Sequence, residues 1–169
     1  MKKVLVTLLS IFLLGSCKPT ANLLTNQKNI NTTLDNWHRA AAVADFETYF
    51  SLMTPNGVFI GTDPTENWQN QDFRSFSKPF FDRGKAWNFT PLERHIYFSD
   101  DAQTAWFDEL LDTQMKLCRG SGTLVKRNNQ WRIAHYVLSI AIPNDSTTEI
   151  VKLKTAFDDK IIQKLQLKK

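Results

Sequence analysis

The sequence lacks the short motifs that mark several common enzyme chemistries. It contains no glycine-rich phosphate loop, no HExxH, no paired CxxC and no GxSxG, so nothing indicates a P-loop enzyme, a zinc protease or a nucleophile-elbow hydrolase. The histidines, His38, His95 and His135, are few and do not have a recognised metal-ligand spacing. We therefore predict neither a metal site nor a cofactor.

Cysteine is also scarce, and one of the two cysteines lies in an export signal. Residues 1–16, MKKVLVTLLSIFLLGS, have two lysines, an apolar run too short to span a bilayer, and then small residues, which is typical of a secretory signal. Residues 14–17, LGSC, resemble the bacterial lipobox. This resemblance implies that Cys17 is diacylated and anchors the protein in the bacterial cell envelope, facing the periplasm or the exterior. The alternative is an ordinary cleaved signal with a chance cysteine.

Export leaves little positive charge and a single thiol. Removal of residues 1–16 takes away two lysines and lowers the formal charge from +4 to +2, and an exported protein does not meet cellular nucleic acid. We therefore predict no nucleic-acid partner. With Cys17 lipidated, Cys118 has no disulfide partner and is expected to pack as a small apolar side chain.

The mature chain is predicted to be one domain of the α+β class. Residues 17–30 are polar and suit a tether, and residues 31–169 form the domain. A long helix starts near Asn31, with a possible break near Ala44 and Asp45. The other expected elements are a turn at 55–57, a strand at 58–60, a helix at 66–82, and strands at 86–90, 92–98, 103–111, 117–126 and 131–142.

The C-terminal segment, from about residue 150, has apolar side chains at helical spacing with lysines between them. This pattern predicts an amphipathic helix. Two interpretations stay open: the helix packs on the domain with a solvated lysine face, or it contacts a membrane surface beside the lipid anchor.

Several segments together resemble the SnoaL-like branch of the nuclear transport factor 2-like superfamily. They extend over residues 33–144: TxxxWHRAAAVADFETYF, VFIGTDPTENW, FFDRGKAW, AWFDEL, RGSGTLVK and WRIAHYVLS. The resemblance implies a cone in which N-terminal helices pack on a strongly curved antiparallel sheet that encloses a pocket, often with dimerisation through the outer sheet face. The superfamily includes ketosteroid isomerase, scytalone dehydratase, polyketide cyclases and binding modules, so it does not fix one activity.

Strand alternation places Asp108 and Glu109 on opposite faces, so only one of the two carboxylates can face the pocket. Symmetric hairpins would pair Glu109 with Gly120 and Gly122 with His135, which puts Glu109 and His135 on one face. A single β-bulge would exchange Asp108 for Glu109. The two glycines are expected either to leave room for a ligand or to allow a sharp bend.

A carboxylate in an apolar cavity would have a raised pKa and could move a proton near neutral pH. We therefore name Asp108, Glu109 and His135 as candidate catalytic residues. Arg94 and Arg119 could bind an acidic group of a ligand. Alternatively, one of these arginines could pair with a carboxylate and keep it ionised, which would remove it as a proton donor.

Trp68, at the strand-to-helix segment, and Trp106 complete the candidate ligand-binding set, with Arg94 and Arg119. The main hypothesis is a lipid-anchored protein that binds a small, partly apolar molecule and forms a homodimer. The alternatives are a cofactor-independent isomerase, dehydratase or cyclase, and a dimeric interaction module whose pocket is filled by its own aromatic residues.

Overall fold

The structure is a computed structural model that describes residues 19–168, so the signal sequence and Cys17 lie outside the described residues. The chain forms one sheet with helices before, within and after it. The elements are α1 Pro19–Ala42, α2 Phe46–Ser51, β1 Met53–Ile60, β2 Asn67–Gln69, α3 Asn70–Asp82, β3 Phe89–Phe98, β4 Thr104–Thr113, β5 Lys116–Arg127, β6 Gln130–Ile140, a 3₁₀ turn Asn144–Ser146 and α4 Thr147–Gln166.

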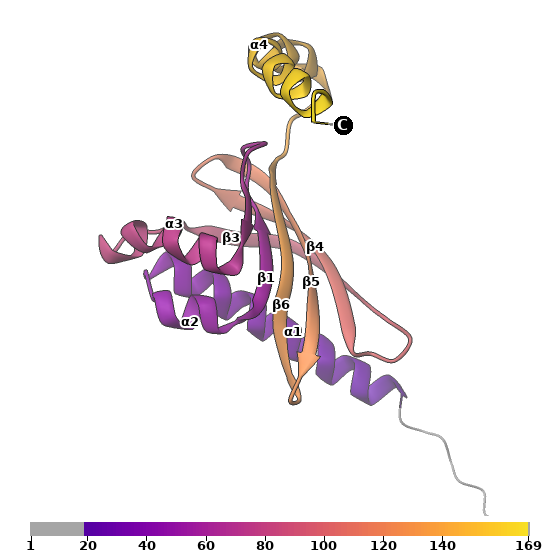
Figure 1. Ribbon diagram of the computed structural model, residues 1–169. Helices are drawn as coiled ribbons and strands as arrows, with labels where there is room; N and C mark the ends of the chain where they lie inside the picture. Colours follow the sequence, from indigo (N-terminus) through magenta and orange to yellow (C-terminus); the bar gives the residue numbers. More distant parts are fainter. Residues whose placement is uncertain (1–18, 169) are drawn as a thin grey trace, which may run out of the picture.

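The six strands form a curved sheet in the order β2-β1-β6-β5-β4-β3. Helices α1, α2 and α3 lie on one face of the sheet, as Figure 1 shows. The long strands β3 to β6 are joined by hairpins and pair antiparallel, whereas β1 pairs parallel with β6. The predicted α+β class and helix-on-curved-sheet arrangement are confirmed, with one parallel pair that the prediction lacked.

Aromatic side chains fill the space between the helices and the sheet. The rings of Trp37 and Tyr49 stack with centroids 4.8 Å apart. Phe59 stacks on Phe73 at 4.2 Å and on Tyr136 at 5.6 Å. All five side chains are buried, so the centre of the cone is a packed aromatic core.

The break predicted in the first helix is confirmed, but the tether is wrong from Pro19 onward. Helix α1 ends at Ala42, and Asp45 caps α2 by accepting a bond from the Thr48 backbone N–H at 3.0 Å. At its other end, α1 already includes residues 19–30, where Asn26 and Ile30 are buried one turn apart. No other described side chain of this segment is buried, and the polar residues around these two gave no helical apolar pattern in the sequence.

Three predicted boundaries also shift. The expected turn at residues 55–57 lies inside β1, at an irregularity in register between Met53 and Val58, where a proline without an N–H is tolerated. The helix expected from Glu66 starts at Asn70, after the short strand β2. The strand expected at 86–90 begins only at Phe89.

The predicted C-terminal helix is present as α4, and of the two interpretations left open, its burial does not support packing on the domain. None of its described side chains is buried, and the helix projects beyond the end of the sheet (Figure 1). Ile150 and Ile161 are half-buried, while Leu153 and Phe157 are exposed. Among the described residues no helix is long and apolar enough to cross a membrane. Cys118 is a buried free thiol, as expected.

Candidate functional site

Strand β4 places its two neighbouring carboxylates in different environments. Glu109 points into the core and is fully buried, at 0 % exposure, together with Phe107 and Leu111 on the same face. Asp108 points to the other face of the sheet, and its side chain is 32 % exposed. Glu109 is therefore the inward-facing carboxylate, and Asp108 is not a residue of the cone interior.

The register of β5 and β6 determines which residue faces Glu109. Glu109 pairs with Gly120, as predicted, but Gly122 pairs with Tyr136 instead of His135. The cause is an irregularity between Thr123 and Leu124, a bulge that shifts the β5–β6 pairing by one residue. His135 consequently lies on the outer face, opposite Thr123, and the predicted placement of His135 beside Glu109 is wrong.

The carboxylate of Glu109 is held by three side chains from three elements. His38 Nε2, on α1, lies 2.8 Å from Oε1, and the Tyr136 hydroxyl donates to the same oxygen at 3.1 Å. Arg94 Nε, on β3, donates to Oε2 at 2.9 Å, and Arg94 Nη2 lies 2.8 Å from the same oxygen. Both carboxylate oxygens therefore have partners although no water reaches them.

These partners decide the protonation of Glu109. Burial is the largest influence and raises its pKa, but the hydrogen bond and charge of His38 and of Arg94 act in the opposite direction and leave the pKa below the ordinary glutamate value. Burial and the neighbouring Glu109 carboxylate raise the pKa of Tyr136, so its hydroxyl remains a donor. The expected raised carboxylate pKa is therefore wrong for Glu109, which is an ionised acceptor.

The two candidate arginines, like the two carboxylates, differ in burial: one lies inside the cone and the other on the outer face. Arg94 is mostly buried and also reaches α1, where Nη1 donates to Asp35 Oδ1 at 2.8 Å and to Asn31 Oδ1 at 3.1 Å. Arg119 is exposed on the outer face, 3.8 Å from Asp108. The internal arginine–carboxylate pair, one of the two alternatives from the sequence, is thus formed by Arg94 and Glu109.

His38 is the site residue that the sequence did not assign. Because an ionised carboxylate only accepts hydrogen bonds, His38 Nε2 must donate to Glu109. His38 also lines a shallow open hollow of about 310 Å³, together with Asp35, Arg39 and Phe89. We call it the side hollow. The helical pattern did place His38 on the apolar side of α1, but nothing local indicated a partner 71 residues away.

A separate hollow of about 210 Å³ opens at the mouth of the cone, and we call it the aromatic hollow. Trp68 lines it, as predicted, and stacks on Phe76 with centroids 4.8 Å apart. Glu66, Gln114 and Thr62 supply its polar groups. The remaining lining residues are mostly aromatic or aliphatic: Phe59, Gly61, Phe73, Phe80, Trp87, Phe89, Met115 and Leu138.

Trp106 does not belong to this hollow. It lies on the outer sheet face, is 47 % exposed, and stacks against the exposed Tyr97 at 6.0 Å. The same face carries Asp108, whose Oδ1 lies 3.2 Å from His95 Nδ1. Of the predicted ligand-binding residues, only Trp68 therefore lines the aromatic hollow. Within residues 19–168, no group of three histidine, cysteine or acidic side chains is placed to hold a metal ion.

Comparisons with known proteins bear on the fold. Among curated proteins none matches the chain. A nuclear transport factor 2-like (NTF2-like) protein of unknown function from Pseudomonas putida has a TM-score of 0.60 at 11% identity, over 73% of this chain and 92% of its own. A protein from Novosphingobium aromaticivorans, proposed to be a scytalone dehydratase, has a TM-score of 0.62 at 12% identity, over 73% of this chain and 89% of its own. At such identities the likeness shows the fold alone.

A third similar structure is a function-unknown protein from Mycobacterium tuberculosis, with a TM-score of 0.61 at 15% identity over 78% of this chain and 81% of its own. The family match is independent of these structures. Residues 30–143, which hold both the Glu109 network and the aromatic hollow, match the family described as SnoaL-like domain. The chain therefore belongs to the SnoaL-like domain family of the NTF2-like superfamily.

Proposed function

We propose that the protein binds a small, largely apolar molecule with a planar ring in the aromatic hollow. The observation that supports this best is the composition of the hollow, in which stacked rings form the wall and a few polar groups, Glu66, Gln114 and Thr62, could orient a ligand. Its volume of about 210 Å³ suits a molecule smaller than most drug-sized ligands, whose pockets measure about 300–1000 Å³.

The ring geometry of the wall favours a flat ligand. The rings of Trp68 and Phe76 are nearly parallel, with an interplanar angle of 18°, and those of Phe73 and Trp87 lie at 25° with centroids 5.8 Å apart. A further ring inserted beside such pairs gains offset stacking of about 0.5–1.5 kcal/mol beyond the apolar area it buries.

Native mass spectrometry of the full chain, purified in mild detergent from its own host, tests this proposal. We expect a discrete retained mass that is lost or much reduced in Phe76→Ala and Trp68→Ala. Trp106→Ala is the matched control, because it removes an exposed ring outside the hollow. Retention that is the same in all variants, or reduced only by Trp106→Ala, would contradict the assignment to the aromatic hollow.

We also propose that the protein is lipid-anchored through Cys17 in the bacterial cell envelope. The support is the sequence of residues 1–17 alone. Labelling with radioactive palmitate should mark the wild type, and Cys17→Ser should remove the label. An unlabelled wild type would contradict lipidation and leave an ordinary cleaved secretory signal as the interpretation of this segment.

A second candidate function is proton transfer by His38 at the side hollow, in a cofactor-independent isomerase, dehydratase or cyclase. The supporting observation is that His38 both lines an open hollow and bonds to the ionised Glu109. By accepting the hydrogen bond from His38 Nε2, Glu109 would fix the tautomer of His38 and leave its Nδ1 as the nitrogen that accepts a proton.

The retained molecule provides the test of this second candidate. If this molecule also enters the side hollow as a substrate, it should be converted by the wild type and at least about 100-fold more slowly by His38→Gln. A molecule that stays unchanged with the wild type over long incubation would remove the enzymatic interpretation, while retention by itself would still support the binding protein.

A further inference from the structure

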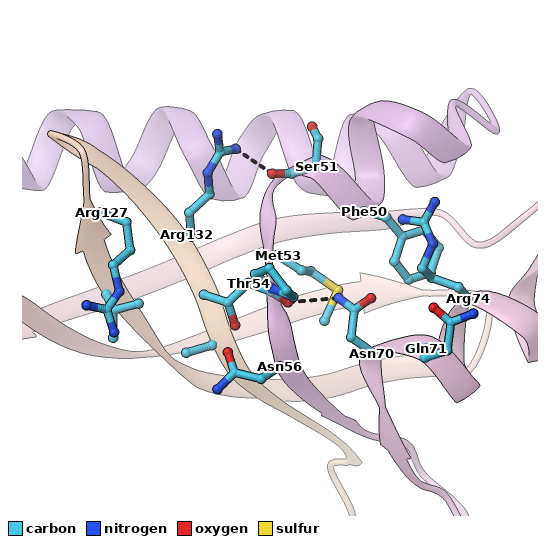
Figure 2. Close-up of a pocket in the computed structure, with 13 residues that line it drawn as sticks. Phe50, Ser51, Met53, Thr54, Asn56, Asn70, Gln71, Arg74, Arg127 and Arg132 are labelled. Carbon is cyan, nitrogen blue, oxygen red and sulfur yellow. Dashed lines mark hydrogen bonds between the residues drawn. The ribbon is translucent and has the colours of Figure 1, made fainter.

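A third hollow, larger than the other two, lies where β1 and α3 begin and where β5 meets β6. It is open to solvent, has a volume of about 680 Å³, and shares no residue with the aromatic hollow. Figure 2 shows its wall. The lining residues are Phe50, Ser51, Met53, Thr54, Pro55, Asn56, Asn70, Gln71, Arg74, Val125, Arg127, Arg132 and Ala134, and we call this site the arginine hollow.

The lining carries three positive charges and no negative one. Arg74 comes from α3, Arg127 from the end of β5 and Arg132 from β6, and the other lining residues are uncharged. Arg74 Nη2 lies 3.8 Å from Oε2 of Glu47, whose side chain is 85 % exposed and lies outside the lining, so Glu47 neutralises little of the charge. Within residues 19–168 no side-chain carboxylate pairs with Arg127 or Arg132.

Two of the three guanidinium groups are held in place without losing their charge. Arg132 donates to the Ser51 carbonyl oxygen, and its Nη2 donates to Gln130 Oε1 at 2.7 Å. The Arg74 guanidinium lies over the rings of Phe46 and Phe50, at 4.9 and 4.8 Å from their centroids. These neutral partners fix the positions of the charges, which lowers the entropy lost when an anion binds.

The backbone and the amide side chains add to the positive potential. Asn70 and Gln71 are the first residues of α3, so the positive end of the helix dipole lies in the wall of the hollow. The N-cap residue Gln69 makes no capping bond with its side chain. Thr54, which is buried in the floor, has a hydroxyl without a hydrogen-bond partner in the described structure.

The arrangement of the charges limits the shape of a ligand. In Figure 2, Arg74 and Arg127 stand at opposite sides of the hollow, with Thr54 and Asn56 between them. This arrangement favours a ligand with separated negative groups over a single small anion. Met53, Val125 and Ala134 also give the wall apolar surface, which favours a carbon skeleton over an inorganic ion alone.

We propose that the arginine hollow binds a soluble organic anion that carries at least two separated negative groups, such as carboxylates or phosphate esters. The charged groups pair with the arginines on the two sides, and the polar middle of the molecule contacts the amides of Asn56 and Gln71. This site is independent of the aromatic hollow, so either can exist without the other.

Titration calorimetry of the full chain in non-ionic detergent tests this site with citrate as the probe and acetate as the singly charged comparison. We expect citrate to bind and acetate not to bind. Arg127→Gln should weaken citrate at least about tenfold, because charge-assisted hydrogen bonds are lost. Among the described residues the Arg127 side chain makes no ion pair, so this variant should fold normally. Arg119→Gln is the control: it removes the same charge from the same strand, eight positions away or about 26 Å along it.

Several outcomes would overturn the proposal. Absence of citrate binding, equal binding of citrate and acetate, or equal weakening by Arg119→Gln and Arg127→Gln would each do so, since the last two indicate only a diffuse charge effect. Vesicles of anionic phosphatidylglycerol test whether the hollow binds the headgroup of a membrane lipid instead of a soluble anion. If the chain binds these vesicles through Arg127 but does not bind citrate, the hollow is a membrane contact and not a site for a soluble anion.

Discussion

Arg94 lies directly opposite Glu109 in the β3–β4 pair, and its guanidinium bonds at the same time to Glu109 and to Asp35 on α1. One side chain thus joins the sheet to the helix that covers it. Because Glu109 is also bound by His38 and Tyr136, the network links α1, β3, β4 and β6. We regard this network as structural in the first place, because its carboxylate is ionised and enclosed.

The first prediction concerns this ion pair. Arg94→Met should lower the free energy of unfolding by about 3–5 kcal/mol, because it leaves the buried Glu109 charge without the Arg94 guanidinium. Arg119→Met is the control, since it removes an exposed arginine on the outer face, and it should change stability by no more than about 0.5 kcal/mol. Denaturant unfolding measures both. If both variants change the free energy of unfolding by the same small amount, the Arg94–Glu109 pair does not stabilise the fold.

The second prediction is a pH dependence that follows from the lowered pKa of Glu109. A carboxyl group whose pKa is lower in the folded state stabilises the fold above the unfolded value, about pH 4.3, and loses this contribution as the pH falls through the folded pKa. The difference in stability between the wild type and Glu109→Gln should therefore be largest at neutral pH and shrink below about pH 4.3. A constant difference down to pH 3 would show that folding does not lower the pKa of Glu109, and a difference that grows in favour of the wild type on acidification would show that folding raises it.

The third prediction concerns the close approach of β5 to the network. A Cβ atom at Gly120 would lie against the Tyr136 hydroxyl and 3.0 Å from Glu109 Cγ, so Gly120→Ala should destabilise by about 1–3 kcal/mol through overpacking. Tyr136→Phe removes the hydroxyl and should offset part of this loss. In a double-mutant cycle the two changes should be less than additive by at least about 0.5 kcal/mol. Strictly additive effects would show that the strain of Gly120→Ala does not arise from the Tyr136 hydroxyl.

The sequence predicted the fold well because the helices and strands have periodic patterns of apolar residues. Alternation in β4 separated Asp108 from Glu109. Between β5 and β6, Asn128 and Asn129 adopt φ values of 48° and 62°, the positive φ that a tight hairpin turn requires and that asparagine tolerates. The boundaries that failed have local causes. The polar residues before Asn31 continue α1, and the proline in β1 is tolerated at a register irregularity.

The site was harder to predict because it depends on distant contacts. A bulge between Thr123 and Leu124 replaces His135 by Tyr136 on the inner face, and no residue type in that stretch indicates a bulge. The histidine that does reach Glu109 is His38, on a helix far away in the sequence. Two roles were expected for Gly120 and Gly122, room for a ligand or a sharp bend, and the structure does not show the first, because the side chains of Tyr136 and Phe107 take that space.

The fourth prediction tests the proposed homodimer. Tyr97 and Trp106 form an exposed stacked pair on the sheet face opposite α1, α2 and α3, and burial of such rings favours association. Trp106→Lys should shift the protein to monomer in analytical ultracentrifugation. Leu153→Lys, an exposed apolar residue on α4, should leave the dimer intact. A monomeric wild type would contradict the proposal, and so would a dimer that only Leu153→Lys dissociates.

The fifth prediction is that α4 contributes little to the stability of the domain. None of its described side chains is buried, and half-buried Ile161 and exposed Ile162 line an open hollow together with residues between β1 and β2, so the helix buries little apolar area. A chain ending at Ile142 should lose about 1 kcal/mol or less, a fall in Tm of about 2–4 °C. Ile30→Ala is the contrast, since it empties a fully buried position and should cost about 2–5 kcal/mol. If the truncated chain is destabilised as much as Ile30→Ala, α4 packs on the domain in solution.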